Sequence, residues 1–310
     1  MKIYIACLKK LTTGGIELLH QLCHELDNYE DIDAYIWFED GKDAYIPDCY
    51  KEYKNRFVVD GNPDKDIVLI FPEVWVSKTF YPKYAEHQKV IFFMSVDYYV
   101  ANIPKNLYLK FPKDTIFMSQ SWFAYWYLQG KHIESIYVTD YLNDEYMTAD
   151  LSKPRVRQIL YNPKKGLEVT KRIMAELPNE KFIPIQNMSV AQVKSLMEES
   201  MLYIDFGNHP GKDRIPREAA MCGCCVITNR EGSAAYYEDV SIPEPYRNYV
   251  VLSDYVNFFA FVADRIRYVL NNYDLCVNDF DVYQENIRRE KTQFKEGVRK
   301  LVNRLWKVSI

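Results

Sequence analysis

The fold is decided by the stretch Asp205-Phe-Gly-Asn-His-Pro-Gly-Lys-Asp-Arg-Ile-Pro-Arg-Glu-Ala-Ala-Met-Cys-Gly-Cys-Cys-Val-Ile-Thr-Asn229. It predicts a buried strand at Leu202–Phe206, a charged loop, a short helix and a second strand that resumes at Cys224. Pro216 is expected at the first helical position, where its missing N–H leaves no hydrogen bond unmade. The helix can pack closely on a sheet because it carries small residues, namely Ala219, Ala220, Cys222 and Gly223.

Positive charge is concentrated in the loop of this stretch. Lys212, Arg214 and Arg217 lie beside the start of the predicted helix. Helix N-termini favour anions through their unpaired N–H groups, and arginine binds phosphate through paired hydrogen bonds. The loop therefore predicts a site for an anion such as a diphosphate.

Length and composition predict a globular protein of two domains, since 310 residues contain 48% hydrophobic and 26% charged side chains. The net charge of −4 argues against nucleic acid as a partner. A core-like strand begins at Lys2 and no apolar run reaches the roughly 18 residues of a membrane span, so we expect a cytoplasmic protein without a signal peptide. The seven cysteines include no CxxC pair, which predicts reduced thiols and no metal site.

Two series of short apolar runs alternate with helical patterns along the chain. The first series is Lys2–Ala6, Ala34–Phe38, Ile67–Phe71, Val90–Met94, Thr115–Met118 and Ser135–Thr139. The second is Arg157–Tyr161, Phe182–Ile185, Leu202–Phe206, Cys225–Thr228 and Tyr249–Leu252. The main helices are expected at Gly15–Leu26, Leu167–Leu177, Val190–Ser200, Pro216–Cys222 and Asp254–Asn271. Alternation of this kind predicts an α/β protein with two doubly wound, Rossmann-like domains built on parallel sheets.

The last segment is a basic amphipathic helix. Residues 286–310 carry an excess of lysine and arginine, and a stripe at helical spacing is formed by Phe294, Val298, Leu301, Val302 and Leu305. We expect this helix to pack back on the protein with its basic face in solvent. The alternative, which is compatible with the first, is contact with an anionic membrane surface.

Ligands of doubly wound sheets bind at the carboxyl ends of the strands, and three loops follow such ends. Thr12-Thr-Gly-Gly15 offers hydroxyl and N–H groups, although a plain helix cap is the alternative. Asn162-Pro-Lys-Lys-Gly166 places two lysines before a helix, with a surface turn as the alternative. The third loop spans 207–218, where Glu218 also suits the first turn of its helix. No dinucleotide fingerprint follows the first strand, which disfavours a dehydrogenase.

The order, spacing and type of these motifs resemble those of nucleotide-sugar-dependent glycosyltransferases of the GT-B fold, nearest to the family-4 type. The resemblance covers nearly the whole chain. It implies two domains that face each other across a cleft, with 1–150 on the acceptor side and 151–285 binding the nucleotide sugar. Met147–Pro154 is the expected linker.

The resemblance also implies roles for individual residues. Glu218-Ala-Ala-Met-Cys-Gly223 resembles the second half of the family's E-x7-E signature, but the position eight residues before Glu218 holds Pro210. We therefore expect the catalytic set to comprise His209, Lys212, Asp213 and Glu218. The donor diphosphate is expected at Gly15, Lys164, Lys165, Arg214, Ser233 and Ala234. The nucleoside is expected at Asn162, Gln186, Asn187, Met188 and Glu218.

The implied activity is transfer of a sugar from a nucleoside diphosphate, UDP or GDP, to a saccharide or lipid-linked acceptor in surface polysaccharide synthesis. Retention of configuration is implied, and cationic side chains would make a metal unnecessary. An inverting reaction would need a base, for which His20, Glu73 and Asp97 are candidates. Two alternatives stay open: a non-catalytic GT-B partner subunit, and a transferase that takes a phospho-alditol from a CDP-linked donor. The protein would act in the cytoplasm, or at the inner face of the membrane.

Overall fold

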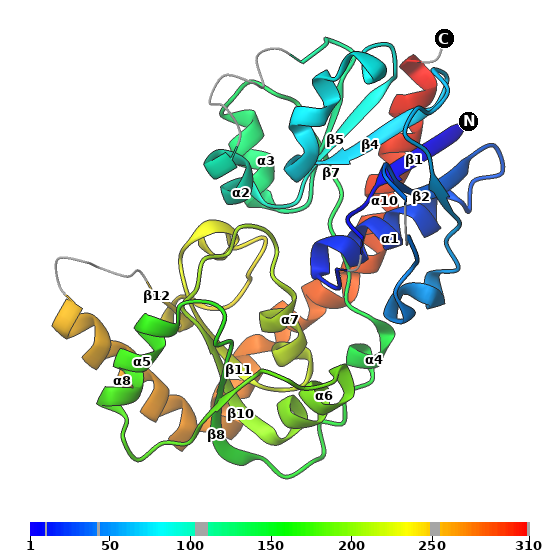
Figure 1. Cartoon of the computed structure of the whole chain (residues 1–310). Helices are drawn as coiled ribbons and strands as arrows, with labels where there is room; N and C mark the ends of the chain where they lie inside the picture. Colours follow the sequence, from blue (N-terminus) through cyan, green and yellow to red (C-terminus); the bar gives the residue numbers. More distant parts are fainter. Residues whose placement is uncertain (10, 42–43, 103–110, 249–254, 309–310) are drawn as a thin grey trace. The chain divides into compact units, whose positions relative to one another are not determined.

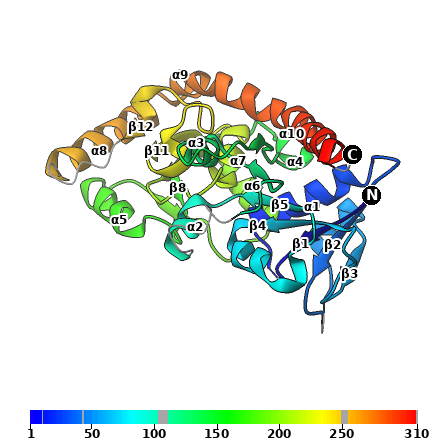
Figure 2. The same cartoon turned by 90° about the horizontal axis from the view of Figure 1, so that it is seen from above.

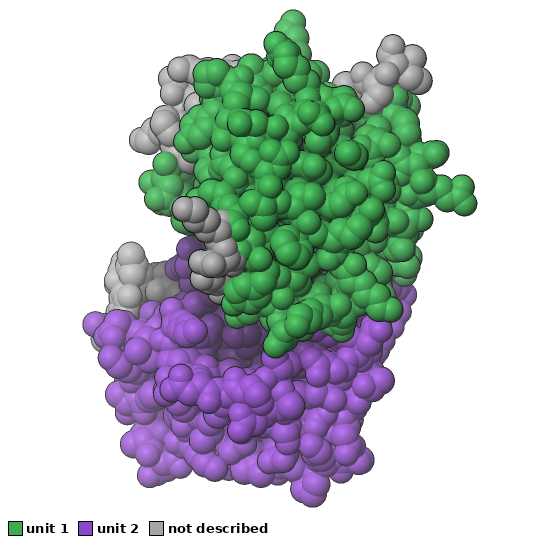
Figure 3. All heavy atoms as spheres, turned by 45° about the vertical axis from the view of Figure 1, so that its right-hand side comes forward, with its two compact units in different colours: residues 1–141, 291–310 green, residues 142–290 purple. Residues whose placement is uncertain are grey.

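The computed structural model describes residues 1–9, 11–41, 44–102, 111–248 and 255–308 (Figure 1). The chain divides into two compact units, which Figure 3 shows in separate colours. Unit 1 comprises Met1–Tyr141 together with Lys291–Ile310, and unit 2 comprises Leu142–Glu290.

Unit 1 is built on a seven-stranded parallel sheet in the order β3-β2-β1-β4-β5-β6-β7. Its strands are β1 Lys2–Ala6, β2 Asp33–Phe38, β3 Phe57–Val59, β4 Val68–Pro72, β5 Lys89–Phe93, β6 Ile116–Ser119 and β7 Ile136–Tyr137. The direction of winding reverses between β1 and β4, which is the pattern of a doubly wound sheet.

Helices cover both faces of this sheet (Figures 1 and 2). They are α1 Gly14–Leu26, α2 Val96–Asn102 and α3 Trp122–Gln129, with 3-10 turns η1 Asp48–Tyr53, η2 Glu73–Phe80 and η3 Pro82–Tyr84. Alternate residues of β1 enter two separate cores. Ile3 and Ile5 pack with the apolar face of α1, whereas Tyr4 and Ala6 pack with side chains of η2, α2 and α3.

Unit 2 is built on a five-stranded parallel sheet in the order β12-β11-β10-β8-β9. Its strands are β8 Val156–Tyr161, β9 Phe182–Pro184, β10 Ser200–Asp205, β11 Cys225–Asn229 and β12 Arg247–Asn248. The winding reverses between β8 and β10, so this sheet is also doubly wound. The predicted fold class is thus confirmed, while the predicted strand Tyr249–Leu252 lies outside the described residues.

The helices of unit 2 pack in pairs, α5 with α8 and α6 with α7, as Figures 1 and 2 show. They are α4 Asp144–Met147, α5 Leu167–Glu176, α6 Val190–Glu199, α7 Arg214–Met221, α8 Tyr255–Asn271 and α9 Tyr273–Cys276, with 3-10 turns η5 Gly232–Ala235, η6 Glu244–Tyr246 and η8 Val277–Phe280. Helix α7 begins two residues earlier than predicted. Pro216 is therefore its third residue, where an N–H would still have no partner within the helix.

The final helix is α10 Asp281–Val308. Its residues up to Glu290 belong to unit 2, and those from Lys291 belong to unit 1. From Lys291 onward it supplies five buried side chains to the core of unit 1, namely Phe294, Val298, Leu301, Val302 and Leu305. Its basic residues are exposed, among them Arg288, Arg289, Lys295, Arg299, Lys300 and Arg304. The division after Tyr141 lies ahead of the predicted linker, since Tyr146 is already buried in the core of unit 2. Within the described residues, none of the helices combines the length and apolar character that crossing a membrane requires.

Candidate functional site

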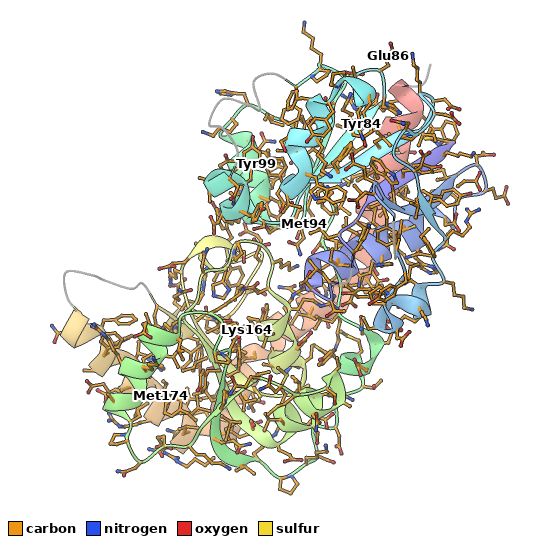
Figure 4. The ribbon with its side chains drawn as sticks, viewed as in Figure 1. Tyr84, Glu86, Met94, Tyr99, Lys164 and Met174 are labelled. Carbon is orange, nitrogen blue, oxygen red and sulfur yellow. The ribbon has the colours of Figure 1, made fainter. Side chains whose placement is uncertain are left out.

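The sequence motifs of unit 2 gather at the carboxyl ends of β8 and β10, the point where the winding of the sheet reverses. In open α/β sheets this is where ligands bind. The turn after β8 contributes residues 162–166, with Lys164 labelled in Figure 4, and the loop after β10 contributes residues 206–213. The two segments touch: a Cβ on Gly166 would lie 2.3 Å from the Phe206 carbonyl oxygen. Gly166 has φ +57°, so only glycine fits this contact without strain.

Asn162 shapes the turn that carries the two lysines. Its Oδ1 accepts a hydrogen bond from the Lys164 N–H at 3.0 Å, and its carbonyl oxygen accepts from the Lys165 N–H at 3.3 Å. Lys164 is exposed, whereas the side chain of Lys165 is 28% exposed. Asn162 therefore acts on the turn in this structure, and Lys165 is the lysine that lies against the neighbouring loop.

Four charged groups form a chain at this edge. Lys165 Nζ lies 2.6 Å from Asp213 Oδ2, and the same oxygen lies 2.8 Å from His209 Nδ1. On the other side of the imidazole, Nε2 lies 3.8 Å from Asp205 Oδ1. Asp205 also accepts hydrogen bonds from the Tyr203 hydroxyl and the Gly207 N–H, at 2.8 and 3.0 Å. The chain alternates positive and negative charge from solvent to interior.

Neighbouring charges outweigh burial in setting the pKa shifts of His209 and Asp213. Burial by itself lowers the pKa of His209, but Asp213 and Asp205 outweigh that effect and the pKa is raised. Burial by itself raises the pKa of Asp213, but His209 and Lys165 outweigh it and the pKa is lowered. The surroundings therefore favour the charged forms of both groups, the imidazolium of His209 and the carboxylate of Asp213.

Asp205, His209 and Asp213 could also hold a metal ion, since one ligand atom from each lies within 4.8 Å of the others. The two carboxylates lie at opposite nitrogens of the imidazole, however, and a cation can bind only one of those nitrogens at a time. Asp213 is also paired with Lys165. A cation would have to displace two positive charges to bind here.

Arg214 and Glu218 lie together on the first turns of α7. Arg214 Nε is 3.8 Å from Glu218 Oε1, and its Nη2 donates to Asn143 Oδ1 at 3.4 Å. The sequence suggested the first turn of the helix for Glu218. Because α7 starts at Arg214, Glu218 is in the second turn. Both side chains are largely buried, with 11% and 14% exposure.

Lys212 and Arg217, expected to hold an anion, both form ion pairs with Glu290 of α10. Lys212 Nζ lies 2.8 Å from Glu290 Oε1, and Arg217 Nη1 lies 2.7 Å from Glu290 Oε2. All three side chains are buried. Arg217 also donates to the carbonyl oxygens of Lys212 and Asp213, at 3.2 and 3.1 Å. This triad fastens the loop after β10 to α10.

The loop that contains Ser233 and Ala234 is hydrogen-bonded to the backbone of the loop after β10. The Ser233 N–H donates to the His209 carbonyl oxygen at 2.8 Å, and its hydroxyl donates to the Gly211 carbonyl oxygen at 2.6 Å. The Ala234 N–H donates to Glu231. Gly232, at φ +55°, approaches the His209 carbonyl so closely that a Cβ would lie 1.9 Å away. These N–H groups, expected to face a diphosphate, are used within the protein in this structure.

The predicted nucleoside-binding residues Gln186, Asn187 and Met188 follow β9 and are exposed. Asn187 adopts the left-handed conformation with φ +55°, which turns the chain toward the capping box of α6 at Ser189 and Gln192. Exposed Met188 offers an apolar face next to the polar side chains, which suits a nucleobase. The three residues lie at the same end of the sheet as Lys165, since β9 pairs in parallel with β8.

In unit 1, Gly15 and Glu73 follow β1 and β4, the two strands between which the winding reverses. A Cβ added at Gly15 would lie 3.7 Å from the Cε atom of Met94, which Figure 4 labels. Glu73 follows β4, is fully buried, and accepts the Met94 N–H at 2.9 Å. Burial raises the pKa of Glu73 to about 7. Of the other candidate bases, His20 is buried against the ring of Tyr50, and Asp97 is half-buried at the start of α2.

Sequence reasoning missed two residues of the site. Asp205 is the inner carboxylate of the charged chain, and Asn229 donates to the Gly207 carbonyl oxygen at 2.7 Å. Each is the last residue of a buried strand, β10 and β11. A polar residue at the carboxyl end of an apolar strand was the signal that could have identified both.

Comparisons with solved structures identify the fold as that of GT-B glycosyltransferases. Sucrose-phosphate synthase from Thermosynechococcus elongatus matches with a TM-score of 0.67 and 12% identity over 99% of both chains. Anabaena HepE in complex with UDP-glucose matches with 0.65 and 10%, over 98% of this chain and 100% of that one. The lipopolysaccharide outer core galactosyltransferase WaaB matches with 0.53 and 13%, over 94% and 99%. No protein-family model matches the sequence, and neither does any curated protein.

Proposed function

We propose that the chain is a glycosyltransferase that moves a sugar from a nucleoside diphosphate sugar to a saccharide or lipid-linked acceptor. The observation that carries this proposal is the position of Lys165. Its ammonium group lies at the reversal point of the unit 2 sheet, partly exposed and paired with a carboxylate, where a phosphate would be the stronger partner. The fold shared with glycosyltransferases, one of them solved with UDP-glucose, supports a sugar nucleotide as the donor.

In this proposal unit 2 stabilises the departing diphosphate. Negative charge grows on the leaving oxygens as the glycosidic bond breaks, and fixed cations there lower the barrier. Lys165 and the exposed Lys164 supply that charge directly, while Arg214 at the start of α7 adds to the positive field. The base would bind beside Gln186–Met188, and the ribose near Glu218. Since side chains provide the positive charge, the reaction would proceed without a bound metal.

Lys212 and His209 would hold the loop after β10 and Asp213 in place and would not contact the donor. Both are buried, so neither can touch a ligand without movement of the loop. Asp213, with 21% of its side chain exposed, is the member of the predicted catalytic set that can face a donor sugar from this loop. Retention of configuration stays part of the proposal. If the reaction inverts instead, Glu73 is the candidate base whose pKa of about 7 suits proton abstraction near neutral pH, and as a fully buried residue it also needs a movement that uncovers it.

The test is isothermal titration calorimetry with UDP and GDP. Lys165→Ala should weaken binding by about 1.5–3 kcal/mol, the range of hydrogen bonds to charged groups. Lys181→Ala, an exposed lysine before β9, is the matched control and should leave the affinity unchanged. Equal affinity of the wild type and the Lys165 variant for both nucleotides would overturn the phosphate assignment.

A non-catalytic GT-B subunit is the second candidate, and Pro210 favours it, because a glutamate is expected at this position. Slow hydrolysis of a sugar nucleotide separates the two functions. A catalytic chain should release UDP or GDP from one member of a panel of nucleotide sugars, and Asp213→Ala should abolish that release. Absence of hydrolysis across the panel would favour the subunit.

Surface polysaccharide synthesis is the proposed setting, and the exposed basic residues of α10 are the proposed contact with an anionic membrane. Basic side chains near an anionic bilayer contribute about 1 kcal/mol each. Sedimentation with vesicles that contain anionic lipid tests this part. Binding that persists in high salt would contradict an electrostatic contact.

A further inference from the structure

Asp213 occupies the N-cap position of α7 but does not act as a cap within the described part of the chain. An aspartate at this position ordinarily accepts an N–H from the second or third helical residue. Here the third residue is Pro216, which has no N–H to donate. The carboxylate is directed instead toward Lys165 and His209, with both cations on Oδ2.

The two cations differ in how firmly they are held. His209 is fully buried, its carbonyl oxygen accepts from the Ser233 N–H, and Asp205 lies at its far nitrogen. Lys165 lies in a turn, keeps 28% of its side chain exposed, and has a long flexible stem. Lys165 can therefore leave Asp213 without disturbing the core, whereas His209 cannot.

We propose that Asp213 is a displaceable counter-ion for Lys165 and that it makes the site select ligands by their phosphate charge. The inference rests on the proposed function. In the empty site the ammonium group of Lys165 is neutralised by the carboxylate. An arriving diphosphate carries more negative charge than a carboxylate, so Lys165 turns from Asp213 to the phosphate oxygens. His209 stays in place and keeps Asp213 charged and oriented.

Asp213 acts on binding in the opposite sense to a residue that contacts the ligand. The carboxylate competes with phosphate for the same lysine, so it lowers the affinity for a charged ligand. Removing its charge while keeping its shape should tighten binding, and the gain should depend on Lys165. An aspartate that accepted hydrogen bonds from UDP itself would give the opposite result.

A double-mutant cycle tests the proposal with UDP, and with GDP in parallel, by titration calorimetry. Asp213→Asn should bind UDP about fivefold more tightly, which corresponds to about 1 kcal/mol. In the Lys165→Ala background the same substitution should change the affinity by less than about 1.5-fold. Asp150→Asn, an exposed aspartate of the same unit that accepts from Ser152, is the matched control and should have no effect. Weaker or unchanged binding by Asp213→Asn, or equal tightening without Lys165, would overturn the proposal.

A second measurement keeps the test independent of nucleotide binding. An amine-directed acylating reagent, read by peptide mass spectrometry, reports how firmly each lysine is held. Lys165 should become several-fold more reactive in Asp213→Asn, while exposed Lys181 should not change. If the wild type binds neither UDP nor GDP, the proposed function fails, but increased reactivity of Lys165 would still support the counter-ion. Unchanged reactivity would refute it.

Discussion

His20 in unit 1 and His209 in unit 2 are equally buried, with 1% and 0% exposure, yet their surroundings shift their pKa values in opposite directions. His20 stacks on the ring of Tyr50 with centroids 4.6 Å apart, and burial lowers its pKa to about 4. His209 lies between Asp213 and Asp205, which raise its pKa despite the burial. Burial alone therefore does not fix the charge of a histidine; the nearest carboxylates do.

The carboxyl ends of the strands in the two sheets differ in the same way, because burial dominates in unit 1 and paired charges dominate in unit 2. Near the reversal point of unit 1, no lysine or arginine among the described residues forms an ion pair with Glu73, and burial raises its pKa to about 7. At the reversal point of unit 2, Lys165, Asp213 and His209 each have an opposite charge within ion-pair distance. Unit 2 thus pairs its buried charges at this edge, which supports the proposal that it binds the phosphate groups of the donor.

The largest expected effect comes from the buried triad behind the site. Glu290→Gln removes the charge that balances Lys212 and Arg217, and should destabilise unit 2 by about 3–5 kcal/mol in urea unfolding. Glu285→Gln breaks an exposed pair with Arg289 and should cost at most about 1 kcal/mol. Similar small costs for both would mean that unit 2 does not depend on paired buried charge.

Glu73 should make the stability of unit 1 fall as the pH rises. Its pKa is raised from 4.5 to about 7 on folding, so the stability it contributes is complete below pH 4.5 and is lost toward pH 7. Across this range the wild type should lose roughly 3 kcal/mol relative to Glu73→Gln, since one pKa unit is about 1.4 kcal/mol. Denaturant unfolding at a series of pH values measures the difference. A difference that is constant with pH would show that Glu73 is not buried as described.

His20 should have the opposite dependence. Its pKa is lowered from 6.5 to about 4 on folding, so its contribution is complete above pH 6.5 and is lost as the pH falls to about 4. The wild type should lose roughly 3 kcal/mol more than His20→Gln between these limits. The exposed His132 supplies a control, since His132→Asn should follow the wild type. Parallel curves for wild type and His20→Gln would remove the contrast between the two histidines.

The smallest expected effect is that of metal removal. Because Lys165 and His209 already neutralise Asp213, a chelator should change the affinity for UDP by less than about twofold. Calorimetry with and without EDTA, then with added Mg²⁺ or Mn²⁺, measures this. A loss of affinity that either ion restores would identify Asp205, His209 and Asp213 as a metal site and would contradict the pairing of Asp213 with Lys165 and His209.

Much of the fold was predictable because alternation of apolar runs and helical patterns is a local property of the sequence. The elements that escaped prediction lack that signal. β3 is only Phe57–Val59, and α3 has aromatic residues on most of its surface, from Trp122 to Tyr127, so it shows no clear apolar stripe. The start of α7 was misplaced because Pro216 is compatible with several positions in a first helical turn.

The sequence predicts which charged loops form the site, but it does not predict which of their side chains face solvent and which are buried. Lys165 and Lys212 both follow strands in glycine-containing loops, yet one reaches solvent and the other is buried. The difference depends on Glu290, which lies 73 residues beyond Arg217 in the chain. No local pattern reports such a partner, and its role emerges only when the chain is folded.

Helix α10 has a consequence for the order in which the protein can be made. Unit 2 is a continuous stretch of chain, but the core of unit 1 includes Phe294, Val298 and Leu301 from the far end of the sequence. During translation the first 141 residues emerge early and must wait for that helix before their apolar face is covered. Ribosome-bound intermediates should therefore show a protease-resistant unit 2 while the earlier-made unit 1 is still susceptible.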